Sequence, residues 1–318
     1  MNASAAQLWQ RLKAANLVHG EAPEIKQTDS PWYVKLLLGV AGWWAAAFGL
    51  SFLILLFTMF MDNTAAVLIL GSLLIGGAFL RLRQPEQVFL EQLALAISLA
   101  GQVLVILVIF NAMSSFGSAR FDSGLNWVLA GLFEAFLVLV IPHFVHRVFC
   151  TWNAAMFFTV ALVLFELPYI FTSVVMLMMV LFWLHEYTYS KHIEKIRAVA
   201  YGLTFALVTM ESFVLFVSKG ASNGWVAALT EPMTQPWMGE ALLGCVAFYL
   251  IWSLFQQNKQ PIEQSLVIYL LFATLLMVAA SFEAPGLTVG MVIVLLGFTG
   301  SNRVLMGIGI VSLLLYVS

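Results

Sequence analysis

Long uncharged apolar runs, separated by short polar connections, make up most of this chain. A helix needs about 20 apolar residues to cross a hydrocarbon core of about 30 Å, and residues 36–61 form a first run of that kind. The pattern predicts an all-α protein, a polytopic transmembrane helix bundle of about eleven spans, within ten to twelve. The later runs cover residues 64–80, 88–110, 126–141, 148–165, 169–184, 198–217, 237–255, 267–281, 287–298 and 304–317.

The polar segment that precedes the first apolar run forms a separate unit. Leu8 and Leu12 fall on one face of a helix while Lys13 lies off it, which predicts a short amphipathic helix. This segment has no apolar stretch typical of a cleavable signal peptide, so the first apolar run is expected to direct insertion. We therefore predict a cytoplasmic N-terminal segment at residues 1–31, which contains a short amphipathic helix and a linker. It is followed by a transmembrane helical domain at residues 32–318.

The composition supports a membrane protein and argues against a soluble one. Hydrophobic residues account for 62% of the 318 residues and charged residues for 9%, and the mean hydropathy is +0.97. A soluble domain has roughly 25% charged residues, so this chain has too few to cover a surface exposed to water. The net charge of −2 gives no reason to expect nucleic acid as a partner, and the lipid bilayer is the expected environment.

The basic residues give the helices an orientation. When the apolar runs are threaded back and forth through a membrane, twelve of the fourteen Lys and Arg residues fall on one side. Short cytoplasmic loops are enriched in Lys and Arg, so that side and the N terminus are predicted to be cytoplasmic. The twelve residues are Arg11, Lys13, Lys26, Lys35, Arg81, Arg83, Arg147, Lys191, Lys195, Arg197, Lys259 and Arg303, which leaves Arg120 and Lys219 outside.

Polar groups inside the apolar runs are the candidates for function. An ionised side chain at the centre of a bilayer costs roughly 2.5–3.5 kcal/mol on insertion scales, so such residues are rarely accidental. No Lys or Arg lies deep in a predicted span, which indicates that the carboxyl groups are protonated or face a water-filled cavity. The candidate residues for a proton or ion path are Glu134, Glu211, Glu91, Ser98, Gln102 and Thr204.

These carboxyl groups have two interpretations. They could line an internal path that exchanges protons or binds a cation, or each could be a neutral group that holds a pair of helices together through hydrogen bonds. Both interpretations stay open for Glu134, in the middle of its run, and for Glu211. The structural interpretation is favoured for Glu91 and Glu166, which lie near the ends of their runs.

Cysteine and histidine patterns give weaker signals. Cys150 and Cys245 both lie inside apolar runs, where a thiol usually behaves as a small buried hydrophobe. His143 and His146 could place two imidazoles on one helical face, but a metal site would need further ligands from the loop at residues 185–192. Histidines at membrane interfaces are the commoner explanation, and we predict no metal and no cofactor.

The sequence lacks the short motifs that identify common enzyme classes. It contains no H-E-x-x-H zinc motif, no G-x-S-x-G nucleophile turn, no P-loop and no dinucleotide-binding fingerprint. We therefore predict that the protein is not an enzyme.

The last two apolar runs are short for complete spans and rich in glycine. Glycines allow helices to approach closely in lipid, and they also occur where membrane helices tilt or break. We favour ordinary close packing for the glycines of this region, which are Gly286, Gly290, Gly297, Gly300, Gly307 and Gly309.

The segment Ser30-Pro-Trp-Tyr-Val-Lys-Leu-Leu-Leu-Gly39, followed by Gly42-Trp43, resembles an uncharacterised family of bacterial polytopic inner-membrane proteins. It is a domain-of-unknown-function family, often encoded beside a smaller membrane protein with a GDYXXLXY motif. The resemblance implies a location in the bacterial inner membrane and a GDYXXLXY-type protein as a candidate partner, and it transfers no catalytic residue. Members of the family continue past the position of Tyr316 with a tyrosine-rich stretch and another apolar segment. The resemblance therefore favours a truncated chain with a twelfth span over the alternative, a natural end at the outer surface.

Two functions follow from these observations. The first is an integral inner-membrane transporter or channel-like protein whose intramembrane carboxyl groups line a path. The alternative is a non-catalytic membrane partner or assembly factor for the neighbouring GDYXXLXY-type protein.

Overall fold

The computed structural model describes residues 3–15, 32–57, 63–83, 88–114, 123–165, 167–186, 192–218, 236–257, 264–284 and 286–317. Within these ranges the chain forms helices and turns and has no strand, which confirms the all-α prediction. The helices are α1 (Ala3–Ala14), α2 (Trp32–Phe57), α3 (Thr64–Leu82), α4 (Val88–Ser114), α5 (Gly124–Val140), α6 (Phe144–Leu164), α7 (Pro168–Leu184), α8 (Ile193–Ser218), α10 (Pro236–Gln257), α11 (Gln264–Ser281), α12 (Leu287–Thr299) and α13 (Arg303–Val317).

Four helices in the described parts of the chain are long and apolar enough to cross a membrane. They comprise Thr64–Leu82 in α3, Val88–Ala112 in α4, Phe144–Leu164 in α6 and Met238–Gln256 in α10. Shorter apolar helices complete the bundle, among them Gly124–Val140 in α5 and Arg303–Tyr316 in α13. At 1.5 Å rise per residue, the 15 residues of α13 measure about 22 Å, which is less than the hydrocarbon thickness.

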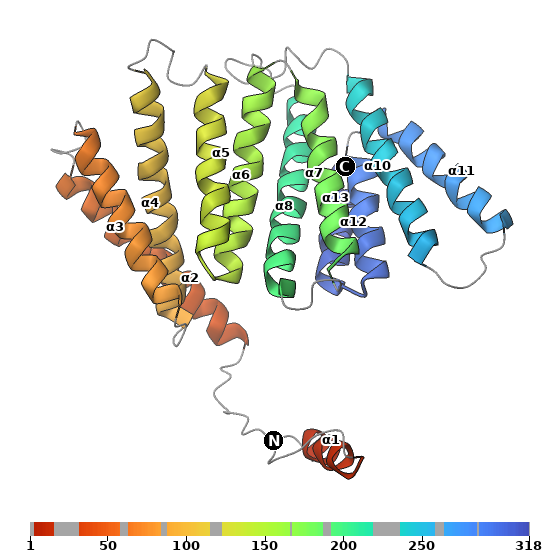
Figure 1. Cartoon of the computed structure of the whole chain (residues 1–318), viewed down its shortest axis with the longest axis horizontal. Helices are drawn as coiled ribbons and strands as arrows, with labels where there is room; N and C mark the ends of the chain where they lie inside the picture. The colour runs from red at the N-terminus through yellow and green to blue at the C-terminus, as the bar shows by residue number, and fades with distance from the viewer. Residues whose placement is uncertain are drawn as a thin grey trace.

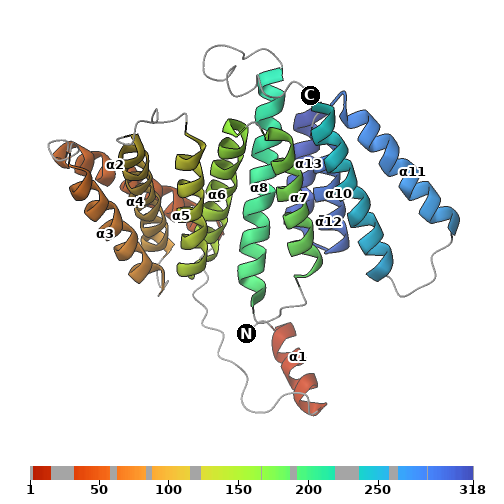
Figure 2. The same cartoon turned by 45° about the horizontal axis from the view of Figure 1, so that its top comes forward.

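Successive helices from α2 to α13 run in alternate directions, and α1 lies apart from them at one end of the bundle (Figures 1 and 2). The turns α5–α6, α7–α8 and α12–α13 all lie at that same end. Helix α3 packs against α4, and α5 packs against α6. Because α6 also packs against α8, it connects the N-terminal helices α2–α5 with the helices that follow it. In α1, Trp9 and Leu12 are half-buried while Arg11 and Lys13 are exposed, as expected of an amphipathic helix.

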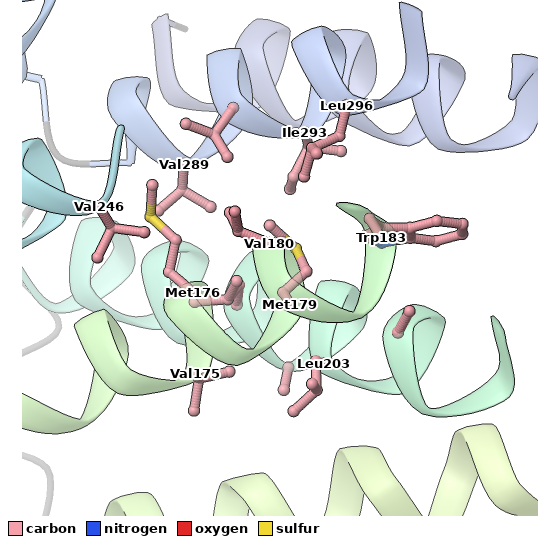
Figure 3. Packing of buried hydrophobic residues seen from close by; sticks show 14 of the residues in the cluster. Val175, Met176, Met179, Val180, Trp183, Leu203, Val246, Val289, Ile293 and Leu296 are labelled. Atoms are coloured by element: carbon pink, nitrogen blue, oxygen red, sulfur yellow. The ribbon is translucent and has the colours of Figure 1, made fainter. Parts of the chain in front are cut away.

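The largest apolar core surrounds α7. Figure 3 shows Met176 of this helix between Val246 of α10 and Val289 of α12, and Val180 facing α12 near Ile293. Because 17 residues of predominantly apolar sequence form α7, the helix can be buried on several faces at once, against α8, α10 and α12. A second, smaller core includes Leu95 of α4, and it places the polar residues of that helix next to α5 and α6.

Glycine residues allow two pairs of helices, α3 with α4 and α12 with α13, to pack at short distance. A Cβ atom at Gly101 would lie 2.8 Å from the carbonyl oxygen of Gly71, so α3 and α4 meet backbone to backbone there. In the terminal hairpin, a Cβ atom at Gly297 would lie 2.5 Å from the backbone nitrogen of Met306, and one at Gly309 would lie 2.7 Å from that of Val294. Both α12 and α13 are continuous helices, so the prediction of ordinary packing is confirmed.

Large apolar side chains cover much of the outer surface of the bundle. On α11, Ile268, Tyr269 and Phe272 are each more than half exposed. Side chains of this kind are favourable in a hydrocarbon environment and unfavourable in water. Cys245 of α10 is also exposed, so the expectation that both cysteines are buried is wrong for this residue and right for Cys150.

Candidate functional site

Two polar stripes on different helices meet inside the bundle. Side chains three, four, seven or eleven positions apart lie on one face of a helix, and both stripes follow such a spacing. The stripe on α4 consists of Glu91, Ser98 and Gln102, and the stripe on α6 consists of His143, His146 and Cys150. Together with Glu134 of α5 we call these residues the histidine cluster.

The first contact of the histidine cluster lies at the end of the bundle that carries the α5–α6 turn. His143 caps the N terminus of α6, and its extended backbone turns the ring back toward α4. The Nε2 atom of His143 lies 2.9 Å from Oε1 of Glu91, while Nδ1 accepts the backbone N–H of His146 at 3.4 Å. The Glu91 and His143 side chains remain 25% and 10% exposed, so this contact is accessible from that end.

The second contact surrounds the fully buried ring of His146. Ser98 Oγ lies 2.8 Å from Nε2 of this ring, and Gln102 Nε2 donates to the same nitrogen at 3.0 Å. An amide nitrogen only donates, so in this orientation of Gln102 the ring carries its proton on Nδ1. That nitrogen lies 3.3 Å from Sγ of Cys150, and it donates to the sulfur.

The innermost member of the histidine cluster is Glu134, whose side chain has no exposed surface. Neither carboxyl oxygen has hydrogen-bond geometry with any described group, although the Cys150 thiol lies beside the carboxyl group. The Oε1 atom of Gln102 is likewise buried without a partner among the described residues. A buried polar group normally finds a hydrogen bond, so these unpaired atoms make Glu134 and Gln102 candidates for a functional role.

The nearest basic side chain along α6 has a structural role. Arg147 is buried in the first turn, where its Nε donates to the carbonyl oxygen of Val138 at 3.0 Å. It also interacts electrostatically with Glu194 of α8. Arg147 thus joins α5, α6 and α8 at the end of the bundle.

A second group of polar residues lies near the opposite end. Glu211 of α8 interacts electrostatically with Glu240 of α10 and with Tyr316 of α13. Glu240 accepts a hydrogen bond from Ser281 Oγ at the end of α11, and the Tyr316 hydroxyl donates to the carbonyl oxygen of Val208 at 3.3 Å. We call Glu211, Glu240, Ser281 and Tyr316 the carboxylate group.

The six candidates from the sequence therefore do not form one connected path. Four of them belong to the histidine cluster, and Glu211 belongs to the carboxylate group. Thr204 belongs to neither, because its hydroxyl donates to the Ala200 carbonyl at 2.8 Å and accepts the Trp183 indole N–H at 3.4 Å. Glu166 lies outside the described residues.

Six members of the two groups are absent from the sequence candidates. They are His143, His146, Cys150, Glu240, Ser281 and Tyr316. The ring of His146 lies in the first turn of α6 and is buried against α4, which the sequence alone did not indicate. The signal was the polar spacing of His143, His146 and Cys150, which matches the polar face of α4. Nothing in a single sequence pairs those two faces, because helix contacts depend on the tertiary fold. The His143 and His146 rings also bind different partners, Glu91 and Ser98, rather than converging on one point.

Comparisons with known proteins give one family match. No curated protein and no solved structure matches the chain. Residues 31–318 match the family described as Domain of unknown function (DUF4401), which covers most of the chain. The protein is therefore a member of the DUF4401 family.

Proposed function

We propose that the chain is a multi-pass protein of the bacterial inner membrane with about eleven spans and a cytoplasmic N terminus. The proposal is supported by the alternating helices and by the exposed apolar side chains. It is also supported by the described residues Arg81, Arg147, Arg197 and Arg303, which lie at the helix ends on the side of the bundle where α1 lies. An alkaline phosphatase reporter fused after Ser218 should be active, and the same reporter fused after Gln257 should be inactive. The reverse pattern would show that the orientation is inverted.

We infer that the protein carries out a transport or channel-like activity in which the histidine cluster takes up and passes on a proton. One observation supports this inference. His146 contacts Ser98 of α4 on one side and Cys150 on the other, and Cys150 lies beside the Glu134 carboxyl group, which has no hydrogen-bond partner among the described residues. The cluster extends from a partly exposed Glu91–His143 pair to the fully buried Glu134. Protonatable residues in such a series are typical of proton relays in membrane proteins.

The residues suggest how a proton would move. A proton enters at His143, and it must reach His146 by a swing of the His143 ring or across a water molecule, since the two rings share no side-chain hydrogen bond among the described contacts. His146 then holds it between Gln102 and Cys150. Rotation of the Gln102 amide would replace its Nε2 donor by its unpaired Oε1 acceptor next to the His146 ring. The cluster can therefore stabilise either a neutral or a protonated His146.

The test is a flux assay with the full chain reconstituted into liposomes that enclose a pH-sensitive dye. Under an imposed proton gradient, wild type should acidify the lumen, and Glu134→Gln and His146→Phe should abolish this flux. Glu283→Gln is the matched control, because Glu283 is an exposed carboxylate outside the cluster. Flux that is equal in all four proteins, or equal to that of empty liposomes, would rule the inference out.

Glu211→Gln separates two versions of the activity. Loss of flux in this variant would mean that the carboxylate group forms the second half of the same path. Retained flux would confine the path to the histidine cluster.

The partner role stays a prediction. It proposes that the chain forms a complex with the GDYXXLXY-type membrane protein, and co-purification of the two from a bacterium that encodes both tests it. Separate migration, with no change in either protein when the other is deleted, would contradict this role.

A further inference from the structure

Two adjoining cavities lie between α6, α8 and α13, on the side of α6 that is turned away from the histidine cluster. The first is an apolar groove of about 630 Å³ with aromatic and aliphatic walls. The second is a polar pocket of about 730 Å³ at the end of the bundle that carries the α12–α13 turn. They share Phe144, Tyr201 and Val304 as lining residues, so the groove continues into the pocket.

The groove has the depth of one membrane leaflet. It extends along α6 from Phe144 to Trp152 and along α8 from Tyr201 to Thr209. Eight residues of helix measure about 12 Å, and half of a hydrocarbon core of about 30 Å is about 15 Å. At its deep end, the Trp152 indole N–H donates to the Thr209 hydroxyl at 3.2 Å, so the polar atoms there already have partners and leave an apolar floor.

The groove is accessible from the surrounding bilayer. Val304 is 63% exposed, and Phe144 and Phe205 are also exposed. On the opposite side α6 and α8 are in tight contact, because a Cβ atom at Gly202 would lie 2.5 Å from Cβ of Thr151. An elongated apolar chain can therefore enter laterally and cannot pass between the two helices.

The polar pocket presents charges of both signs. A buried carboxylate, Glu186, forms an ion pair with Arg197, while Glu194 and the exposed Arg303 add one negative and one positive charge. The Asn302 amide donates to the Tyr201 hydroxyl at 2.8 Å and thereby holds the ring at the junction of the two cavities. An anion suits Arg303 and a cationic donor suits Glu194, so the pocket is complementary to a zwitterionic group.

We propose that the two cavities bind one phospholipid with a zwitterionic amine headgroup. One acyl chain lies in the groove along α6 and α8, the phosphate contacts Arg303, and the ammonium donates to Glu194. If the N terminus is cytoplasmic, this lipid belongs to the inner leaflet. The site is independent of the proposed proton relay, because Val148 and Trp152 face the groove while His146 and Cys150 face α4.

Native mass spectrometry of the delipidated full chain tests the proposal. An equimolar mixture of phosphatylethanolamine-, choline- and glycerol-headed phospholipids is added, and lipid-bound protein is counted for each class. Wild type should retain one ethanolamine lipid per chain. The amount of bound glycerol lipid should be about fivefold lower than that of the ethanolamine lipid, since one charged contact at a membrane surface changes the affinity by about fivefold.

Matched variants test each end of the site. Val148→Trp fills the groove and Arg303→Gln removes the phosphate contact, and each should lower the retained ethanolamine lipid about fivefold or more. The controls are Val103→Trp, on an exposed face of α4, and Arg83→Gln, at the end of α3. If Val148→Trp does not fold, Val304→Trp on the exposed rim replaces it.

Three results would overturn the proposal. They are the absence of a discrete one-to-one lipid complex in wild type, equal retention of all three headgroups, and equal retention in the groove variants and their controls. Soluble phosphoethanolamine at millimolar concentration should not displace the lipid, because the acyl chain contributes most of the buried surface. Complete displacement by this headgroup alone would show that the pocket binds a soluble ligand instead.

Discussion

The Nδ1 atom of His146 lies 3.3 Å from Sγ of Cys150, one helical turn along α6, and the Cys150 thiol lies beside the carboxyl group of Glu134. This pair connects three helices, because Ser98 and Gln102 approach the other ring nitrogen from α4. A cysteine with no exposed surface cannot react from solution, so its contribution here is a weak hydrogen-bonding group between histidine and carboxyl. The contact makes the interior of α6 the centre of the proposed relay.

Removal of the Glu134 carboxyl group should stabilise the protein. Its oxygens are buried without hydrogen-bond partners among the described groups, and such a group costs about 1–3 kcal/mol. Glu134→Leu should therefore raise the free energy of unfolding by an amount in that range, measured by denaturant titration in detergent. Glu283→Leu, which alters an exposed carboxylate, should change it by less than about 0.5 kcal/mol. A lower stability of Glu134→Leu would mean that the carboxyl group has a stabilising partner.

Replacement of the buried imidazole should have the opposite effect. His146→Ala removes the partner of Ser98, Gln102 and Cys150 at once and leaves a cavity, so we expect a loss of about 2–4 kcal/mol. His185→Ala provides the comparison, because the His185 ring is exposed and contacts the Leu181 carbonyl of its own helix. Equal thermal midpoints for the two variants would show that the ring of His146 contributes no more than a surface histidine.

The positions of the helices can be predicted from the sequence, but the sequence does not predict which helix faces pack against each other. Apolar periodicity and length predicted each helix, since membrane helices satisfy their own backbone hydrogen bonds and are recognisable one at a time. The spacing of Glu91, Ser98 and Gln102 along the chain also places these three residues on one face of α4.

The partner of that face depends on which helices are neighbours, and a single chain does not encode this locally. His146 lies in the first turn of α6, and only the tertiary fold shows that its ring is buried against Ser98 and Gln102 of α4. Glu240 near the start of α10 and Tyr316 near the end of α13 interact with Glu211 only because the tertiary fold brings these helix ends close to α8. Glu240 and Tyr316 lie 29 and 105 residues after position 211 in the sequence, so no local sequence pattern indicates this contact.

The crossing of α3 and α4 should be sensitive to a single methyl group. A Cβ atom at Gly101 would lie 2.8 Å from the Gly71 carbonyl oxygen and 2.9 Å from a side-chain carbon of Ile75, so Gly101→Ala forces the helices apart. We expect a loss of about 1–3 kcal/mol in unfolding free energy. Gly76→Ala on α3 meets no atom within 4 Å and should be neutral or slightly stabilising. A neutral Gly101→Ala would show that the two helices are farther apart than in this structure.

The Glu186–Arg197 ion pair at the end of α7 and α8 should respond asymmetrically to the loss of either partner. The Glu186 side chain is 5% exposed and that of Arg197 is 43% exposed, so only the carboxylate depends on its partner for solvation. Arg197→Gln leaves a buried uncompensated charge and should cost about 3 kcal/mol. Glu186→Gln leaves a hydrated guanidinium and should cost about 1 kcal/mol or less.

The distinguishing measurement is the size of the two deficits at pH 7, determined by denaturant titration in detergent. The physical reason for a larger deficit in Arg197→Gln is that the Glu186 side chain is almost completely buried, whereas that of Arg197 is in contact with solvent. Equal deficits at pH 7 would mean that water reaches Glu186 and that the pair behaves as a surface salt bridge.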